Sequence, residues 1–276
     1  MQKVSFLILS FFFFIDFASA QFYYKDLISN AQLVSDMKLY KENKVKTVRI
    51  KSFEDDGTES DGFFCQKNVS KDYRRTELMT RSNISSRSML ISLFDKEGKL
   101  LSTNDSSDIS VSRTNYVYDQ QNRISRILTS VRSQDDDFTN AMLEEHIYQY
   151  NEQNQPVKMT RVKNRVDSSV ISFATDENNN IAIEKDSKSG SKYYYYYDAK
   201  KRLTDIVQTN DFRTNLHPDY IFEYNSANQV TQMTVTEEGG NDYFVWKYVY
   251  DNGLRSGERC YTKERKLMGS VAYEYN

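Results

Sequence analysis

The amino-acid sequence predicts an all-β protein in which tandem antiparallel β-hairpin repeats form one large coiled, partly open sheet, with a short N-terminal helix. The first observation is a motif of two alternating tyrosines followed by Asp or Asn, which recurs along most of the chain. The second is the composition: 14% of the 276 residues are aromatic and 28% are charged, whereas 9 are Gly and 2 are Pro. Such a chain folds, and it is unlike collagen or a proline-rich linker.

Residues 1–20 have the pattern of a secretory signal peptide. The segment opens with Lys3, continues through an apolar run over residues 6–15, and ends in Ala18-Ser-Ala20. These are the charged start, the apolar region and the small residues before a cleavage site. The run is shorter than the roughly 20 residues of a membrane helix. We therefore expect export to the periplasm, the outer-membrane surface or the extracellular space, without a transmembrane helix; the alternative is an N-terminal core helix.

The mature chain, residues 21–276, is treated as one domain that begins with a lead-in segment over residues 21–44. Within the lead-in, apolar residues at positions 27, 28, 31, 34 and 37 share one face of a helix over residues 26–40. This spacing predicts a short helix. We expect it to cap the first hairpin.

The first hairpin region comprises residues 45–88. Residues 45–53 alternate between apolar and polar side chains, Asp56-Gly57 is a turn signal, and residues 63–65 are again apolar. Two such runs separated by a turn signal are typical of a β-hairpin.

Residues 89–276 contain the repeats, and the clearest copy is Tyr-Val-Tyr-Asp-Gln-Gln-Asn-Arg-Ile at residues 116–124. Strand alternation places both tyrosine rings on one face. Asp119 suits the first position of a type I turn, and Asn122 suits the left-handed position that closes a three-residue hairpin loop with a bulge. Successive landmarks are 22 to 32 residues apart, so each repeat is one hairpin. The landmarks are Asp95, Asp119, Asn151, Asp176, Asp198, Asn225, Asp251 and Asn276.

Two copies depart from this turn chemistry. Lys201 stands at the left-handed position, where Gly or Asn is favoured, so we expect mild backbone strain there. Asn252-Gly253 is instead the signal of a two-residue hairpin turn.

The repeats predict roughly 17 strands, which at about 4.8 Å per strand make a flat sheet on the order of 80 Å wide. Sheets of more than roughly ten strands curl or split, so we expect a strongly coiled, partly open sheet with its aromatic face inside. Cys65 and Cys260 lie near the two ends of the array. A disulfide between them requires the array to close. The alternative that we favour is two separate, half-buried thiols.

The motif at residues 116–124 resembles the tyrosine-aspartate (YD) repeat of secreted bacterial proteins of the RHS type, in which Tyr-x-Tyr-Asp-x-x-Gly-Arg-Leu units form consecutive hairpins. The resemblance covers about residues 89–276. It implies a β-hairpin architecture and, for small envelope proteins with such repeats, no fixed activity. The turn glycine of that family is present here only as Gly98 and, one position later, as Gly253. The toxin-enclosing role of the large RHS proteins is not implied.

No spacing of residues predicts catalysis. The Gly-x-Ser-x-Gly signature is absent. The two histidines, His146 and His217, are not in a metal-binding spacing. Glu144 and Glu145 precede His146, but such a cluster is more often the solvated entrance of a strand than a carboxylate–imidazole pair.

Three acidic segments invite a calcium interpretation, namely residues 55–61, 135–137 and 176–180. The last of them has Ile181 where a calcium loop needs Gly. Turn chemistry explains all three, so the sequence predicts neither a metal nor a cofactor.

The run of five tyrosines at residues 193–197 is the most unusual local feature. Alternation places Tyr194 and Tyr196 on the face opposite to the other three rings. These two side chains are candidates for an exposed aromatic patch on which a sugar or a partner protein stacks. The alternative is that they form cross-strand aromatic pairs that hold the sheet together.

We interpret the protein as a secreted, non-enzymatic repeat protein that acts as a binding or scaffolding surface in the bacterial cell envelope. Its partner would be an envelope protein or a glycan. The alternative is an outer-membrane β-barrel, although charged residues interrupt each aromatic face after two or three positions. A third interpretation is a glycan-active enzyme with two carboxylates. The net charge of −2 argues against a nucleic-acid partner.

Overall fold

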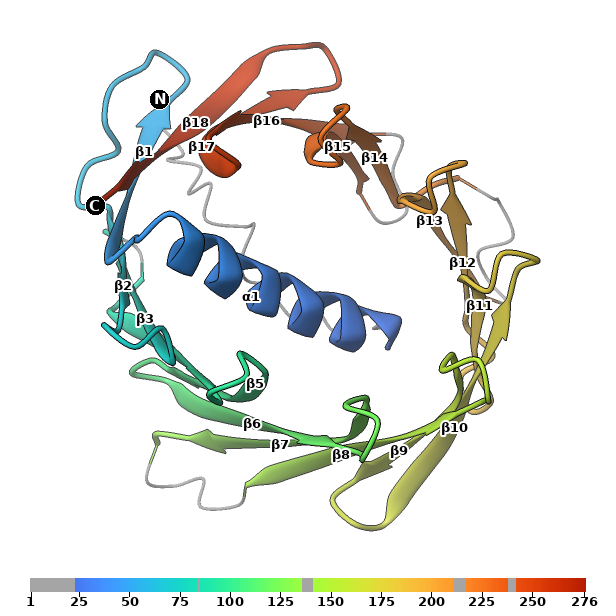
Figure 1. Ribbon diagram of the computed structural model, residues 1–276. Coiled ribbons are helices and arrows are strands. Elements are labelled where there is room, and N and C mark those ends of the chain that lie inside the picture. Colours follow the sequence, from blue (N-terminus) through green and yellow to red (C-terminus); the bar gives the residue numbers. More distant parts are fainter. Residues whose placement is uncertain (1–22, 84, 136–140, 211–216, 238–241) are drawn as a thin grey trace.

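Every strand of the sheet pairs with the strands before and after it in the chain, and the last strand pairs with the first. The computed structural model describes residues 23–83, 85–135, 141–210, 217–237 and 242–276. Within them lie one helix and 18 antiparallel strands. The predicted signal peptide lies outside the described residues. Figure 1 shows the strands as a closed ring with the helix inside it.

The bounds of the elements are α1 (Tyr24–Glu42), β1 (Thr47–Glu54), β2 (Phe64–Val69), β3 (Arg75–Arg81), β4 (Ser88–Phe94), β5 (Leu100–Ser106), β6 (Ser110–Tyr118), β7 (Ile124–Ser133), β8 (Met142–Tyr150), β9 (Pro156–Lys163), β10 (Asp167–Thr175), β11 (Ile181–Asp186), β12 (Lys192–Tyr197), β13 (Leu203–Thr209), β14 (Tyr220–Tyr224), β15 (Val230–Thr236), β16 (Tyr243–Asp251), β17 (Leu254–Thr262) and β18 (Leu267–Tyr275).

The expectation of a partly open sheet is wrong, because β18 closes onto β1. The two strands pair from Val48 opposite Tyr275 to Glu54 opposite Gly269. Just beyond, the Asn276 N–H donates to the Thr47 carbonyl at 2.9 Å. Closure pairs the backbone groups that two free edges would leave open. The predicted all-β class, the antiparallel hairpins and the N-terminal helix are confirmed.

The repeat motif forms hairpins, as predicted. Seven landmarks, from Asp95 to Asp251, lie at strand reversals, and Asn276 lies at the seam between β18 and β1. In the clearest copy the Asn122 N–H donates to the Asp119 carbonyl at 3.0 Å, and Asn122 has φ +63°. The register then shifts by one residue at Tyr118, which is the predicted bulge. Lys201 also has φ +60°, so it adopts the left-handed conformation in which strain is expected.

The second tyrosine of each motif connects neighbouring hairpins through its hydroxyl group. Tyr150, for example, donates to the carbonyl of Ile124 at 2.7 Å, and Ile124 opens the second strand of the previous hairpin. Arg123 stacks on the ring of Tyr150 at 4.5 Å and pairs with Asp119 at 2.7 Å. The motif therefore encodes both a turn and a contact to the next hairpin. The same hydroxyl bond is made by Tyr118, Tyr197, Tyr224, Tyr250 and Tyr275.

The helix α1 does not cap the first hairpin; it crosses the interior of the barrel (Figure 1). Leu27 at one end packs in the core cluster around Tyr148 and Tyr195, whereas Met37 at the other end packs with Val48. Side chains alone do not fill a barrel of this many strands, which explains why a helix packs inside. The buried face is not the predicted apolar face: Ile28 and Ala31 are exposed, whereas Asn30, Met37 and Tyr40 are buried.

The two faces of the barrel wall differ in chemistry. The motif tyrosines point inward and join the core. The outer face carries ionic side chains within the strands: Arg126 on β7 pairs with Glu145 on β8 at 2.9 Å, and Lys185, Lys247 and Arg259 are exposed. No helix long and apolar enough to cross a membrane is found in the described part of the chain.

Candidate functional site

The interior holds a polar network that anchors the start of α1. Glu184 on β11 is 1% exposed, and its carboxylate accepts the backbone N–H groups of Tyr23 at 2.7 Å and Tyr24 at 2.9 Å. Tyr195 donates its hydroxyl proton to the same carboxylate at 2.9 Å. Burial raises the pKa of Glu184 to about 7, although these three donors act in the opposite direction. Glu184 thus supplies the N-terminal cap that no helix residue provides.

His146 on β8 is the second anchor of the helix. Its Nδ1 lies 2.6 Å from Asp26 of α1, and its Nε2 lies 2.9 Å from Glu144, which also accepts from Arg161 at 2.8 Å. Burial alone would lower the pKa of His146, but the two carboxylates outweigh it and raise this pKa to about 9. Burial likewise opposes ionisation of Glu144, yet His146 and Arg161 lower the pKa of Glu144 to about 2.

This arrangement does not resemble a catalytic site. Both ring nitrogens of His146 are engaged by carboxylates, and the residue is 9% exposed, so a substrate would find no free position for proton transfer. The Glu144–His146 pair is real, but it is buried rather than at a solvated strand entrance. Its role is to hold the helix. In the described residues no group of three or more His, Cys, Asp or Glu side chains is arranged to hold a metal.

The residues predicted as sites lie apart from one another. Tyr194 and Tyr196 do point outward from β12; Tyr196 is 48% exposed and Tyr194 is half-buried between Ile183 and Val207 of the adjacent strands. Cys65 on β2 and Cys260 on β17 are free, buried thiols. Two strands, β18 and β1, separate the strands that carry them, which is too far for a disulfide even in the closed ring.

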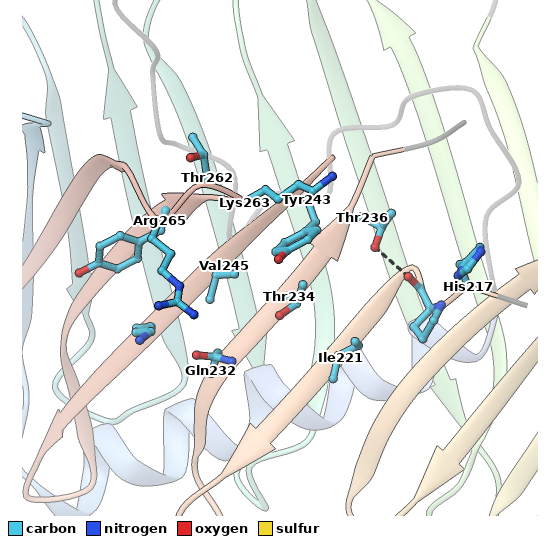
Figure 2. A pocket seen from close by; sticks show the side chains of 13 residues that line it. His217, Ile221, Gln232, Thr234, Thr236, Tyr243, Val245, Thr262, Lys263 and Arg265 are labelled. Atoms are coloured by element: carbon cyan, nitrogen blue, oxygen red, sulfur yellow. Dashed lines mark hydrogen bonds between the residues drawn. The ribbon is translucent and has the colours of Figure 1, made fainter. Parts of the chain in front are cut away.

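A groove on the outer wall crosses β14 to β17 and has a volume of about 760 Å³. Its floor is a row of directly paired residues, one from each strand: Ile221, Thr234, Val245 and Tyr261. Figure 2 shows most of these side chains in front of the strands, with the helix behind the sheet. Because the neighbouring residues on the same strands, such as Trp246, belong to the interior core, the groove lies on the opposite, outer face.

The ends of the groove are formed by loops and strand ends. At one end Thr236 donates its hydroxyl proton to the Pro218 carbonyl at 2.8 Å, which fixes the entry to β14 against β15 (Figure 2). At the other end the turn between β17 and β18 places Arg265 over the groove, with φ +64°. That turn repeats the left-handed backbone conformation of the motif without the Tyr-x-Tyr-Asp pattern.

The lining of the groove is aromatic, hydroxylated and cationic. Tyr243 and Tyr261 supply rings, and Lys247 lies 5.7 Å from the centre of the Tyr261 ring. Lys263 is 3.7 Å from Asp242. The described lining residues include Lys247, Lys263 and Arg265 but no carboxylate. Beside the lining, Glu223 accepts a hydrogen bond from Gln232 at 2.5 Å.

The groove was not predictable from the sequence, because its residues belong to four strands whose relative register the sequence does not specify. Individually, Thr234 and Lys247 are ordinary outward residues of alternating strands. A signal was nevertheless present, since Tyr243 and Tyr261 are tyrosines that do not belong to the Tyr-x-Tyr-Asp pattern.

Comparisons with known proteins give weak likenesses. No protein-family model and no curated protein sequence matches the chain. A porin-like protein from Bacteroides uniformis is similar at TM-score 0.43 and 11% identity, over 84% of this chain and 98% of that one. A porin-like protein from Bacteroides vulgatus gives 0.28 and 12% over the same shares. A TcdB2-TccC3-Cdc42 structure gives 0.38 and 11%, over 79% of this chain and 12% of that one.

The resemblance to the YD repeat family of RHS proteins is wrong as a family assignment. No family model matches, and the hairpins close into one ring of 18 strands. The physical reason is that Tyr-x-Tyr-Asp with a left-handed Asn encodes a turn and a contact between adjacent hairpins. Those contacts are local, so they say nothing about how the sheet ends.

Proposed function

We propose that the protein is an exported, non-enzymatic binding protein of the cell envelope, and that the groove across β14–β17 is its ligand site. The observation that carries the proposal is the ionic outer wall. A lipid-facing barrel needs an apolar outer band about 25 Å tall, and a cation at its midplane costs about 2–4 kcal/mol. Exposed Lys247 and Arg259, near the centres of β16 and β17, contradict such a band, so this outer wall is suited to water and to polar ligands.

The size and the lining of the groove support a binding role. Ligand sites are usually concavities of about 300–1,000 Å³ with rings and a few polar groups, and the groove has this size and lining. The groove lining contains no carboxylate and no cysteine among the described residues, and the buried His146 network serves the helix. These features favour binding over hydrolysis.

A second candidate is an outer-membrane β-barrel. An even number of antiparallel strands, each paired with its sequence neighbours in a closed ring, is the topology of such proteins. Strand length favours the first proposal: a membrane strand needs about 9–11 residues, whereas β14 has 5 and β2 has 6.

Cell fractionation tests the choice between the two. Washing a membrane pellet with high salt or urea should release the protein, because charged outer strands do not insert into lipid. An outer-membrane protein of known β-barrel type serves as the control that stays in the pellet until detergent is added. Recovery of this protein only with detergent would contradict the proposed function.

A further inference from the structure

We propose that the ligand of this groove is an acidic saccharide chain, a polymer whose sugar rings carry carboxylates. This inference rests on the proposed function and deepens it. Its starting point is charge: the chain as a whole has net charge −2, yet the described lining of the groove is cationic and without a carboxylate. A cationic site on a slightly acidic protein selects an anion locally rather than by general attraction.

The two cations that carry the inference come from different elements that line the groove. Lys247 extends from β16 next to Gln232, its partner across the sheet, and Arg265 extends from the turn after β17. Both side chains are exposed. Separate cations along a groove fit charges that repeat along a chain, and each ammonium or guanidinium group forms charge-assisted hydrogen bonds with a carboxylate.

The remaining lining residues point to a sugar. Tyr243 and Tyr261 present rings on which the apolar face of a pyranose packs, whereas Thr234, Thr262 and Gln232 supply hydroxyl and amide groups for sugar hydroxyls. The volume of about 760 Å³ accommodates a short run of sugar units while the open side lets a polymer continue.

Other polyanions fit less well. An extended peptide gains most of its affinity by adding a strand to a free sheet edge, but β14 to β17 are paired on both sides and offer none. Nucleic acid binding needs a broad basic surface, whereas the outer wall outside the groove carries carboxylates such as Glu145 among its cations.

The experiment uses the purified full mature chain and polygalacturonate, with fully methyl-esterified polygalacturonate as the neutral polymer of the same backbone. We expect the acidic polymer to bind at least about tenfold more tightly, and added salt to weaken it. Equal binding of both polymers would overturn the acidic assignment but leave the proposed function intact. Tighter binding of poly-glutamate than of either polysaccharide would overturn the saccharide assignment. If no polymer binds, the inference fails, and only the fractionation result then bears on the proposed function.

Matched variants locate the interaction. Lys247→Gln combined with Arg265→Gln should weaken polygalacturonate binding about tenfold or more, and Tyr261→Ala should weaken both polymers wherever binding is measurable. Lys185→Gln and Tyr196→Ala change the same residue types on the outer face of β11 and β12, and should leave binding unchanged. All four proteins should retain the wild-type thermal transition, because the altered side chains lie outside the core. Wild-type affinity in the groove variants would refute the site.

Discussion

At the scale of single residues, the repeat is a set of left-handed turn positions combined with tyrosine hydroxyls. The turn was predictable because Asp119 and Asn122 act within three residues of each other. The hydroxyl bond was not, since Tyr150 reaches Ile124 of the previous hairpin, 26 residues away. The sequence therefore reveals the hairpins but not what joins them.

Lys201 gives the first prediction. A non-Gly residue at φ +60° is strained by roughly 1 kcal/mol or more. Lys201→Gly should therefore raise the free energy of unfolding by about 1 kcal/mol, measured by urea denaturation. It also removes the exposed hydrogen bond from Lys201 to Asn178, which offsets part of the gain. Lys200→Gly, in the same turn but at negative φ, is the control and should not stabilise; a stabilisation equal to that of Lys201→Gly would refute the explanation.

Tyr150→Phe gives the second prediction. It removes only the hydroxyl that donates to Ile124, so the protein should lose about 1 kcal/mol of unfolding free energy. Tyr196→Phe removes an exposed hydroxyl on the outer wall and should cost nothing measurable in the same denaturation series. Similar losses of unfolding free energy at both positions would show that the hydrogen bond from Tyr150 to Ile124 does not stabilise the fold.

At the scale of elements, helix α1 could be predicted from the sequence, but its position in the fold could not. The apolar face at Leu27 and Met37 predicted a helix, and the observed helix extends two residues beyond each predicted end. Its place inside the barrel was not predictable, because an apolar face does not specify which surface covers it. The buried charges that hold it, Glu184 and His146, come from strands more than 100 residues away.

The helix anchors also give a pH dependence. The pKa of Glu184 is about 7 in the fold and 4.5 ordinarily, and that of His146 is about 9 against 6.5. Both groups are more easily protonated when folded, so their contribution is full below the ordinary values and is lost as pH rises through 7 and 9. Glu144 acts oppositely, and its contribution is lost as pH falls from 4.5 towards 2. Stability should therefore be greatest near pH 4.5.

The variant Glu184→Gln tests the contribution of Glu184 to this dependence of stability on pH. Because the pKa of Glu184 is about 7 in the fold instead of 4.5, this residue accounts for about 3 kcal/mol of stability that is lost between pH 4.5 and 7. The variant should flatten this interval in thermal melts recorded across pH, and leave the decline between pH 6.5 and 9 that His146 causes. Glu152→Gln, at an exposed turn, should preserve the whole profile. A profile of Glu184→Gln that is superimposable on the wild type would contradict the role of Glu184.

At the scale of the whole molecule, the number of strands predicted from the sequence was nearly right, but the prediction of a partly open sheet was wrong. The repeats predicted roughly 17 strands, and the described residues form 18. Closure depends on how far neighbouring strands are twisted and staggered, which no single hairpin determines. The groove shares this limit, because Ile221 and Tyr261 are brought together by register alone.

A cross-link tests closure directly. Arg49 on β1 and Glu274 on β18 lie opposite each other across the seam, so Arg49→Cys with Glu274→Cys should form an intramolecular disulfide on mild oxidation. Burial raises the pKa of the natural thiols Cys65 and Cys260 to about 12, which keeps them unreactive. Arg49→Cys with Ser168→Cys on β10 is the control and should not cross-link. Failure of the seam pair to oxidise would indicate an open ring.

The seam between β1 and β18 joins segments more than 200 residues apart in the chain. Contacts of such long range slow folding, because the intervening polypeptide must be ordered before the last pairing forms. Until that pairing forms, the sheet has two unpaired edge strands, and helix α1 is not enclosed by the barrel. We therefore expect refolding from urea to be slow and prone to aggregation at high protein concentration, with the circle completed last around a helix already in place.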